Sequence, residues 1–136
     1  MGLDGSRENR LGPSSRPQGS TQSFQAINEL VSGLDQRAPI VSIAAMTYLT
    51  GEVLVSRRAV TSGALDGLWR AASSRDVDVA GAALATILLL KNDDPQQRQK
   101  IFSVLAEAPK RREALRLRMV FNLIGADHAL THDLHR

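Results

Sequence analysis

The sequence has no cysteine, few aromatic residues and no apolar run of the roughly 18 residues that cross a bilayer. Without cysteine there is no disulfide framework, no thiolate metal site and no cysteine nucleophile. The five aromatic side chains give little surface for stacking nucleobases. Because the N-terminus also lacks the apolar stretch of a secretory signal, we expect a cytoplasmic protein.

The signatures of the common enzyme classes are missing as well. There is no glycine-rich phosphate loop, no nucleophile elbow and no pair of carboxylates placed on one apolar wall. The two adjacent acids, Asp93 and Asp94, are accounted for by the capping of a helix. We therefore predict a protein that is not an enzyme and that holds no cofactor.

What is present is a composition typical of a globular protein, with 43% hydrophobic and 23% charged residues in 136 positions. Residues 1–22 are the exception, because they are rich in Gly, Ser, Pro, Arg and Gln and cannot repay the entropy of ordering. We predict a disordered N-terminal tail over 1–22, a single α-helical domain over 23–126 and a polar, histidine-containing C-terminal end over 127–136.

The first residues of the tail fit the loose pattern for N-myristoylation, with Gly2 as the acceptor after removal of Met1. A plain flexible leader is the alternative, and binding to a membrane requires the acyl group on Gly2. The composition of the tail also resembles the unstructured secretion leaders of bacterial effector proteins. This resemblance implies a host-targeted effector.

Apolar residues recur at helical spacing from Ser23 onward. Residues 79–90 are apolar nearly all round, which predicts a buried central helix. Asp94 followed by Pro95 predicts the start of another helix, which Pro109 closes. No alternating run joined by a hairpin turn predicts a strand pair.

The helical pattern repeats about every 37 residues. A shift of 38 and then of 37 residues superposes two sets of apolar positions: Ile27, Leu65 and Phe102, and Leu30, Leu68 and Leu105. Each unit is a shorter helix, a tight turn and a longer apolar helix. We predict an all-α fold of about six helices, arranged as helical hairpins over 23–57, 61–91 and 95–126.

The middle unit, with the sequence SRDVDVA over residues 74–80, resembles the junction in HEAT and armadillo-like helical repeats. This resemblance implies three stacked hairpins whose grooves bind another protein. A compact helical bundle is the alternative.

A second resemblance is local. Residues 38–54 are similar to the long central helix of a core histone, which implies DNA binding by paired loop ends. However, the following loop reads VTSG over residues 60–63, where a histone has a Thr-Arg-apolar signature. A coincidence of apolar positions in an amphipathic helix is the alternative.

The densest basic run lies between Lys110 and Arg118, in a chain with a net charge of +3. We expect Leu117, Val120, Phe121 and Ile124 to form the core stripe of the last helix, which turns Arg111 and Arg118 outward and places Arg112 and Arg116 on the flank. The candidate residues for binding a partner or phosphate are Arg57, Arg58, Arg111, Arg112, Arg116 and Arg118. A solvated face is the alternative.

The three histidines, His128, His132 and His135, have the spacing that places imidazoles on one face of a helix, where they could ligate zinc, nickel or copper. The metalloprotease pattern needs a Glu after the first histidine, but Ala129 stands there. The simpler interpretation is a solvated polar end, so we assign no metal.

The leading hypothesis is a non-enzymatic adaptor that binds another protein through a groove or through its basic last helix. The competing hypothesis is a small basic accessory protein that binds nucleic acid. Self-association is a further expectation, because a stack of three units lacks obvious polar end caps.

Overall fold

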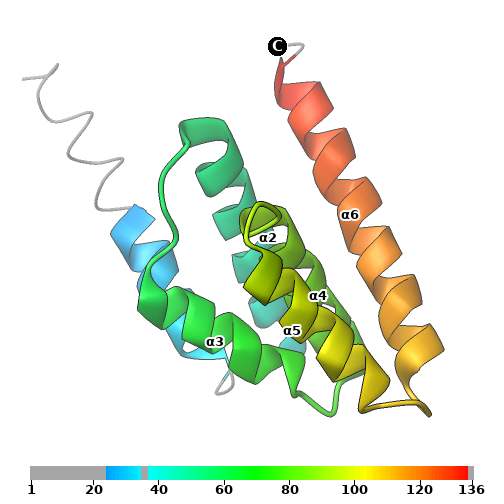
Figure 1. Ribbon diagram of the computed structural model, residues 1–136. Coiled ribbons are helices and arrows are strands. Elements are labelled where there is room, and N and C mark those ends of the chain that lie inside the picture. Colours follow the sequence, from blue (N-terminus) through cyan, green and yellow to red (C-terminus); the bar gives the residue numbers. More distant parts are fainter. Residues whose placement is uncertain (1–23, 35–36, 135–136) are drawn as a thin grey trace, which may run out of the picture.

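Six helices follow one another along the part of the chain that the structure describes (Figure 1). The computed structural model describes residues 24–34 and 37–134, with side chains up to Ala126. The first helix covers residues 24–32, and the others are α2 (Pro39–Ser56), α3 (Ser62–Ala72), α4 (Val77–Leu90), α5 (Pro95–Ala106) and α6 (Arg112–Leu134). These ranges contain no strand, which confirms the predicted all-α fold. The predicted tail over 1–22 lies outside them.

Side-chain caps fix the starts of the three middle helices. The carboxylate of Asp94 accepts hydrogen bonds from the next backbone N–H groups of α5, and Asp76 does the same for α4. The hydroxyl of Thr61 accepts from the backbone N–H of Ala64 at the start of α3. These bonds satisfy N–H groups that have no partner within the helix. The predicted start of a helix at Asp94 and Pro95 is thereby confirmed.

Helix α4 is the centre of the fold. All residues from Val79 to Ile87 are buried, and α4 contacts α2, α3, α5 and α6. The predicted buried central helix is therefore confirmed. Many of its residues are small, which lets the neighbouring helices approach closely.

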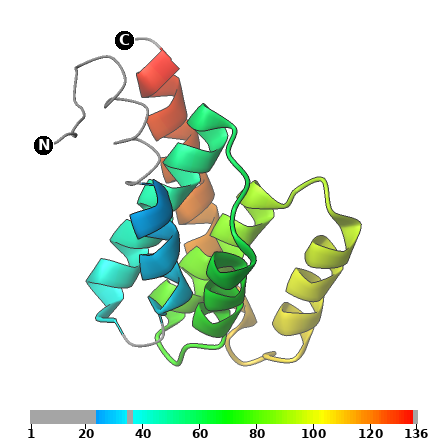
Figure 2. The same cartoon turned by 90° about the vertical axis from the view of Figure 1, so that its left-hand side faces the viewer.

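The longer helices α2, α4 and α6 contact one another, and α3 packs on α4. Helix α5 stands to one side in Figure 2 and has two buried residues, Ile101 and Leu105. Helix α6 continues to Leu134, beyond the expected end of the helical region at residue 126. Its last turns extend past the ends of the neighbouring helices in both views (Figures 1 and 2).

Candidate interaction surface

The basic run before and within α6 does not form the outward face that the sequence predicts. The guanidinium of Arg111 donates a hydrogen bond from Nη2 to the carbonyl oxygen of Ser74, at 2.8 Å, in the turn between α3 and α4. The Nε of Arg112 donates to the carbonyl oxygen of Leu105, at 3.3 Å, at the end of α5. Both side chains therefore tie the start of α6 to the rest of the fold.

Arg118 also faces inward. Its Nη2 lies 2.8 Å from Oδ1 of Asp78 in the first turn of α4, and its aliphatic stem covers Gly81. A Cβ on Gly81 would stand 2.6 Å from both Cβ and Cγ of Arg118, so only glycine leaves room for this approach. The prediction that Arg111 and Arg118 point outward is wrong.

Arg116 is the arginine of this run that faces solvent. Its side chain is 58% exposed, and its Nη1 lies 3.5 Å from Oε1 of Glu113. Such an exposed ion pair contributes little to stability, because both groups keep most of their hydration. Arg116 is therefore available to a partner at small cost.

The remaining two candidates, Arg57 and Arg58, follow α2. Arg57 ends this helix in the left-handed backbone conformation, with φ of 56°, and the guanidinium of Arg58 lies 5.3 Å from the ring centroid of Phe24. The end of α2 and the start of α6 lie at opposite ends of the molecule (Figures 1 and 2). The six predicted arginines therefore do not form one patch.

The face of α6 that packs on the core is the reverse of the predicted one. Leu115 and Met119 are the buried residues of α6 among those whose side chains are described. Leu117, Val120, Phe121 and Ile124, which the sequence assigns to the core, are between 49% and 61% exposed. The cause lies in α4, where Gly81 lets the stem of Arg118 approach and so turns the Leu115 face of α6 inward.

These four exposed side chains form one continuous surface, which we call the α6 apolar stripe: Leu117, Val120, Phe121 and Ile124. Their spacing of three, four and seven residues places them on one face of the helix. Glu113 lies one turn before Leu117 and Arg116 directly before it, and together they give the stripe a charged border. An exposed apolar cluster with a polar rim is typical of a surface that binds another molecule.

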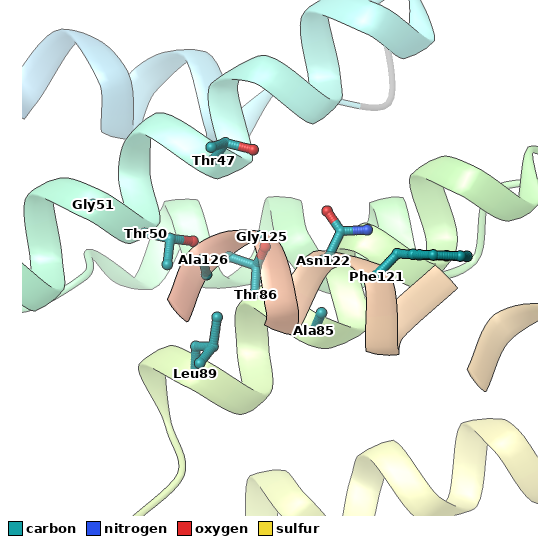
Figure 3. A pocket seen from close by; sticks show the side chains of 10 residues that line it. All are labelled: Thr47, Thr50, Gly51, Ala85, Thr86, Leu89, Phe121, Asn122, Gly125 and Ala126. Atoms are coloured by element: carbon teal, nitrogen blue, oxygen red, sulfur yellow. The ribbon is translucent and has the colours of Figure 1, made fainter. Parts of the chain in front are cut away.

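Beside the stripe, a pocket of about 210 Å³ opens between α2, α4 and α6 (Figure 3). Phe121 belongs to both features. The pocket is lined by residues of the three helices: Thr47, Thr50, Gly51, Ala85, Thr86, Leu89, Phe121, Asn122, Gly125 and Ala126.

The polar groups of the pocket are engaged with the backbone. The hydroxyls of Thr50 and Thr86 each donate to the carbonyl oxygen four residues earlier in their own helix, at 2.8 Å. The amide of Asn122 donates to the backbone of α6 at 2.9 Å. The lining contains no charged residue, so the pocket suits an apolar group.

Two glycines in this lining stand in open space. A Cβ at Gly51 or at Gly125 would meet no atom within 4 Å. Packing within the chain therefore does not require glycine at either position. This pocket was not predicted from the sequence, although a glycine inside an apolar helix is a signal that could have marked it.

The remaining predicted sites fall largely outside the described part of the chain. His128 and His132 lie on the backbone of α6, but their side chains, like His135 and Gly2, are not described. Within the described side chains, no group of three or more His, Cys, Asp or Glu residues could hold a metal ion. The metal and acylation hypotheses stay predictions.

Helix α2 has a distinct composition. Among the described residues it is the one helix whose length and apolar composition would allow it to cross a membrane. The core helix of a soluble protein passes the same test. The exposed apolar side chains of α2 are Ile40, Val41, Tyr48 and Val55.

No protein-family model, no curated protein and no solved structure matches the chain. The resemblances to HEAT-like repeats and to a histone helix therefore stay predictions, since a helical fold by itself supports neither. The function has to be argued from the surface.

Proposed function

We propose that this protein is a non-enzymatic interaction module, an adaptor that binds an apolar helix of a partner protein on the α6 apolar stripe. The observation that carries the proposal is the exposure of Leu117, Val120, Phe121 and Ile124 on one face of α6. Because α6 packs on the core through its opposite face, no other described helix covers this stripe, although the guanidinium of Arg118 in α6 itself lies 5.9 Å from the ring centroid of Phe121.

The chemistry of the stripe fits a helix better than a small polar ligand. Apolar side chains three, four and seven residues apart are the anchors by which one helix packs against another. Each apolar side chain removed from water contributes about 25 cal/mol per Å² of buried area. The adjacent pocket adds a recess into which an apolar side chain of the partner can insert.

A nucleic-acid-binding accessory protein receives less support from the geometry. Arg111, Arg112 and Arg118 donate to acceptors within the fold, and the other candidates are divided between two ends of the molecule. Phosphate binding by the predicted cluster would compete with these contacts for the same side chains.

The experiment that tests the proposal is photocrosslinking in the native host cell. A photoreactive phenylalanine analogue at position 121 is compared with the same analogue at position 102. Phe102 on α5 is the matched control, because it is 64% exposed, against 57% for Phe121, but lies outside the stripe. We expect a specific crosslinked polypeptide from position 121 only.

The polypeptide identified in this way is then purified, and its affinity is measured for the natural chain and for the variants Leu117→Glu, Phe121→Glu and Phe102→Glu. A charge in the centre of an apolar contact weakens binding about a hundredfold, whereas Phe102→Glu leaves it unchanged. Absence of a crosslink from position 121, or equal crosslinking from both positions, contradicts the proposal.

A further inference from the structure

We infer that the partner on the α6 apolar stripe is a second copy of this chain, which pairs with the first through an antiparallel contact between the two α6 helices. This inference rests on the proposed function and names the occupant of the same surface. Three features support it: the positions of Phe121 and Gly125, the distribution of charge along α6, and the accessibility of the helix.

The first feature is a projection and a recess on the same helix face. Phe121 projects as a half-exposed ring, and Gly125, one turn later, leaves open space beside the pocket. In an antiparallel pair with its two-fold axis near residue 123, Phe121 of each copy faces Gly125 of the other. A two-fold axis makes both contacts at once, as an isologous interface requires.

The size of the recess suits the ring. A cavity of roughly 150 Å³ accommodates a benzene molecule, and the pocket at Gly125 has a volume of about 210 Å³. The lining next to Gly125 carries no charge, and its threonine hydroxyls are bonded to the backbone. A phenyl ring from the second copy can therefore enter without leaving a buried polar donor unpaired.

The second feature is charge complementarity along the helix. The first half of α6 is basic and exposes Arg116, while Arg112 and Arg118 are bonded to acceptors within the fold. The second half carries Asp127 and Asp133 in its sequence, with no arginine or lysine up to Leu134. An antiparallel pair places the basic half of each helix beside the acidic half of the other. A parallel pair places like charges together, which is unfavourable.

The helix dipoles favour the same orientation. Arginines near the start of a helix are unfavourable there, because the helix N-terminus carries a partial positive charge. The negative C-terminal end of a second α6 in antiparallel orientation offsets this charge. Arg116 benefits most, since it is the exposed arginine of α6 among the described side chains and lies beside the stripe.

The third feature is that α6 can be reached along its length. Its contacts with α2, α4 and α5 leave the stripe in solvent, and its last turns extend past the neighbouring helices (Figures 1 and 2). A helix of 23 residues is about 34 Å long. Two such helices can therefore pack over several turns.

The test begins with the molar mass of the full chain, measured by sedimentation velocity from low micromolar to several hundred micromolar concentration. We expect the mass to rise from that of one chain to that of two. Phe121→Glu should weaken the dimer about a hundredfold, because it places a charge in the contact, and Phe102→Glu should leave it unchanged.

A second variant removes the recess instead of the ring. Gly125→Leu fills the space opposite Phe121, and a Cβ at this position meets nothing within 4 Å in the folded chain. The variant should therefore keep its helical circular dichroism and thermal unfolding while losing the dimer. A variant that stays folded and dimeric overturns the inference.

The orientation is tested by disulfide formation, for which the absence of natural cysteine is convenient. Copies carrying Phe121→Cys are mixed with copies carrying Gly125→Cys under mild oxidation, so that each mixed dimer keeps one natural contact between Phe121 and Gly125. The same two-fold axis places residue 121 opposite residue 125, so the mixed disulfide should form faster than either symmetric one. Faster symmetric disulfides indicate parallel pairing and overturn the inference.

The two proposals fail separately. A natural chain that is monomeric at every concentration overturns the dimer, while a crosslink from position 121 to a different polypeptide keeps the interaction module. Absence of any crosslink from position 121 overturns both.

Discussion

Some glycines inside the helices are tightly packed, whereas others have open space around them. At Gly67 a Cβ would stand 2.1 Å from the carbonyl oxygen of Val31, so α3 and the helix over 24–32 meet backbone to backbone. At Gly51 and Gly125 the corresponding space is empty. Glycine in a helix interior costs about 1 kcal/mol relative to alanine, because its unfolded backbone has more freedom. The first kind of glycine is required by packing within the chain, and the second kind is not.

Alanine substitutions should therefore change stability in opposite directions. We expect Gly51→Ala and Gly125→Ala each to raise the free energy of unfolding by about 0.5 to 1 kcal/mol. Gly67→Ala and Gly81→Ala should lower it by about 2 kcal/mol or more, because the helices must move apart. Urea unfolding at low protein concentration measures all four without a contribution from the dimer. A loss of stability in Gly51→Ala would show that its surroundings are not open.

The same glycines connect stability with function. If Gly125 is kept for the second copy, Gly125→Ala stabilises the single chain but weakens the pairing of two chains. Residues at binding surfaces often make the single chain less stable than it could be.

Some arginines of α6 are bonded within the fold, whereas Arg116 is exposed to solvent. Arg118→Ala removes the ion pair with Asp78 and the stem that covers Gly81, so we expect it to lower the free energy of unfolding by about 1 kcal/mol. Arg116→Ala removes an exposed contact and should change the free energy of unfolding by less than about 0.5 kcal/mol. Equal losses in chemical denaturation would contradict this assignment.

At the scale of the elements, α4 contributes most of the core and α5 contributes little of it. Helix α4 has nine consecutive buried residues, whereas α5 has two. Two contacts of Trp69 hold α5 to α3: its Nε1 donates to Oε1 of Gln97 at 2.9 Å, and the Nζ of Lys100 lies 4.4 Å from its ring centroid.

This difference should be visible in hydrogen exchange. We expect the backbone amides of α5 to exchange at least tenfold faster than those of α4, because α5 can open without exposing the core. Trp69→Phe keeps an aromatic ring but removes the donor to Gln97, so it should speed exchange in α5 while α4 keeps its protection. Uniform acceleration in both helices would indicate that α5 opens only with global unfolding.

Local signals in the sequence were sufficient for the existence of the helices and for the start of α5. Asp94 with Pro95 marks the start of α5, and the apolar run that begins at Val79 marks the buried α4, because capping and burial depend on neighbouring residues. The inward face of α6 was predicted wrongly, since this helix carries apolar residues on two faces. The choice between Leu115 and Phe121 as the inward residue was decided by Gly81, a residue of another helix. Contacts between distant segments are not visible in the periodicity of one helix.

At the scale of the whole molecule, the net charge is +3, and the basic side chains are spread over the fold, with Arg116 and Arg118 paired with acids. The candidates Arg57 and Arg58 follow the end of α2, and Arg111, Arg112 and Arg116 lie near the start of α6, at the opposite end (Figure 1). Salt screens exposed charges from one another beyond a Debye length of about 10 Å at 0.1 M ionic strength. The two groups therefore do not act as one field on a nucleic acid.

We expect the purified chain to show no binding to fluorescent duplex DNA or single-stranded RNA at physiological salt, and only weak binding at low salt. A protein that neutralises several phosphates loses affinity by orders of magnitude between these conditions, because it releases counterions. The decisive comparison is between the natural chain and Arg116→Glu, which spares the contacts of Arg111, Arg112 and Arg118 with the fold. Strong, salt-sensitive binding that this variant abolishes would establish a phosphate-binding surface at the start of α6. In the proposed antiparallel pair, the second copy of α6 covers Arg116. A nucleic acid bound at Arg116 would therefore compete with the second copy for this surface.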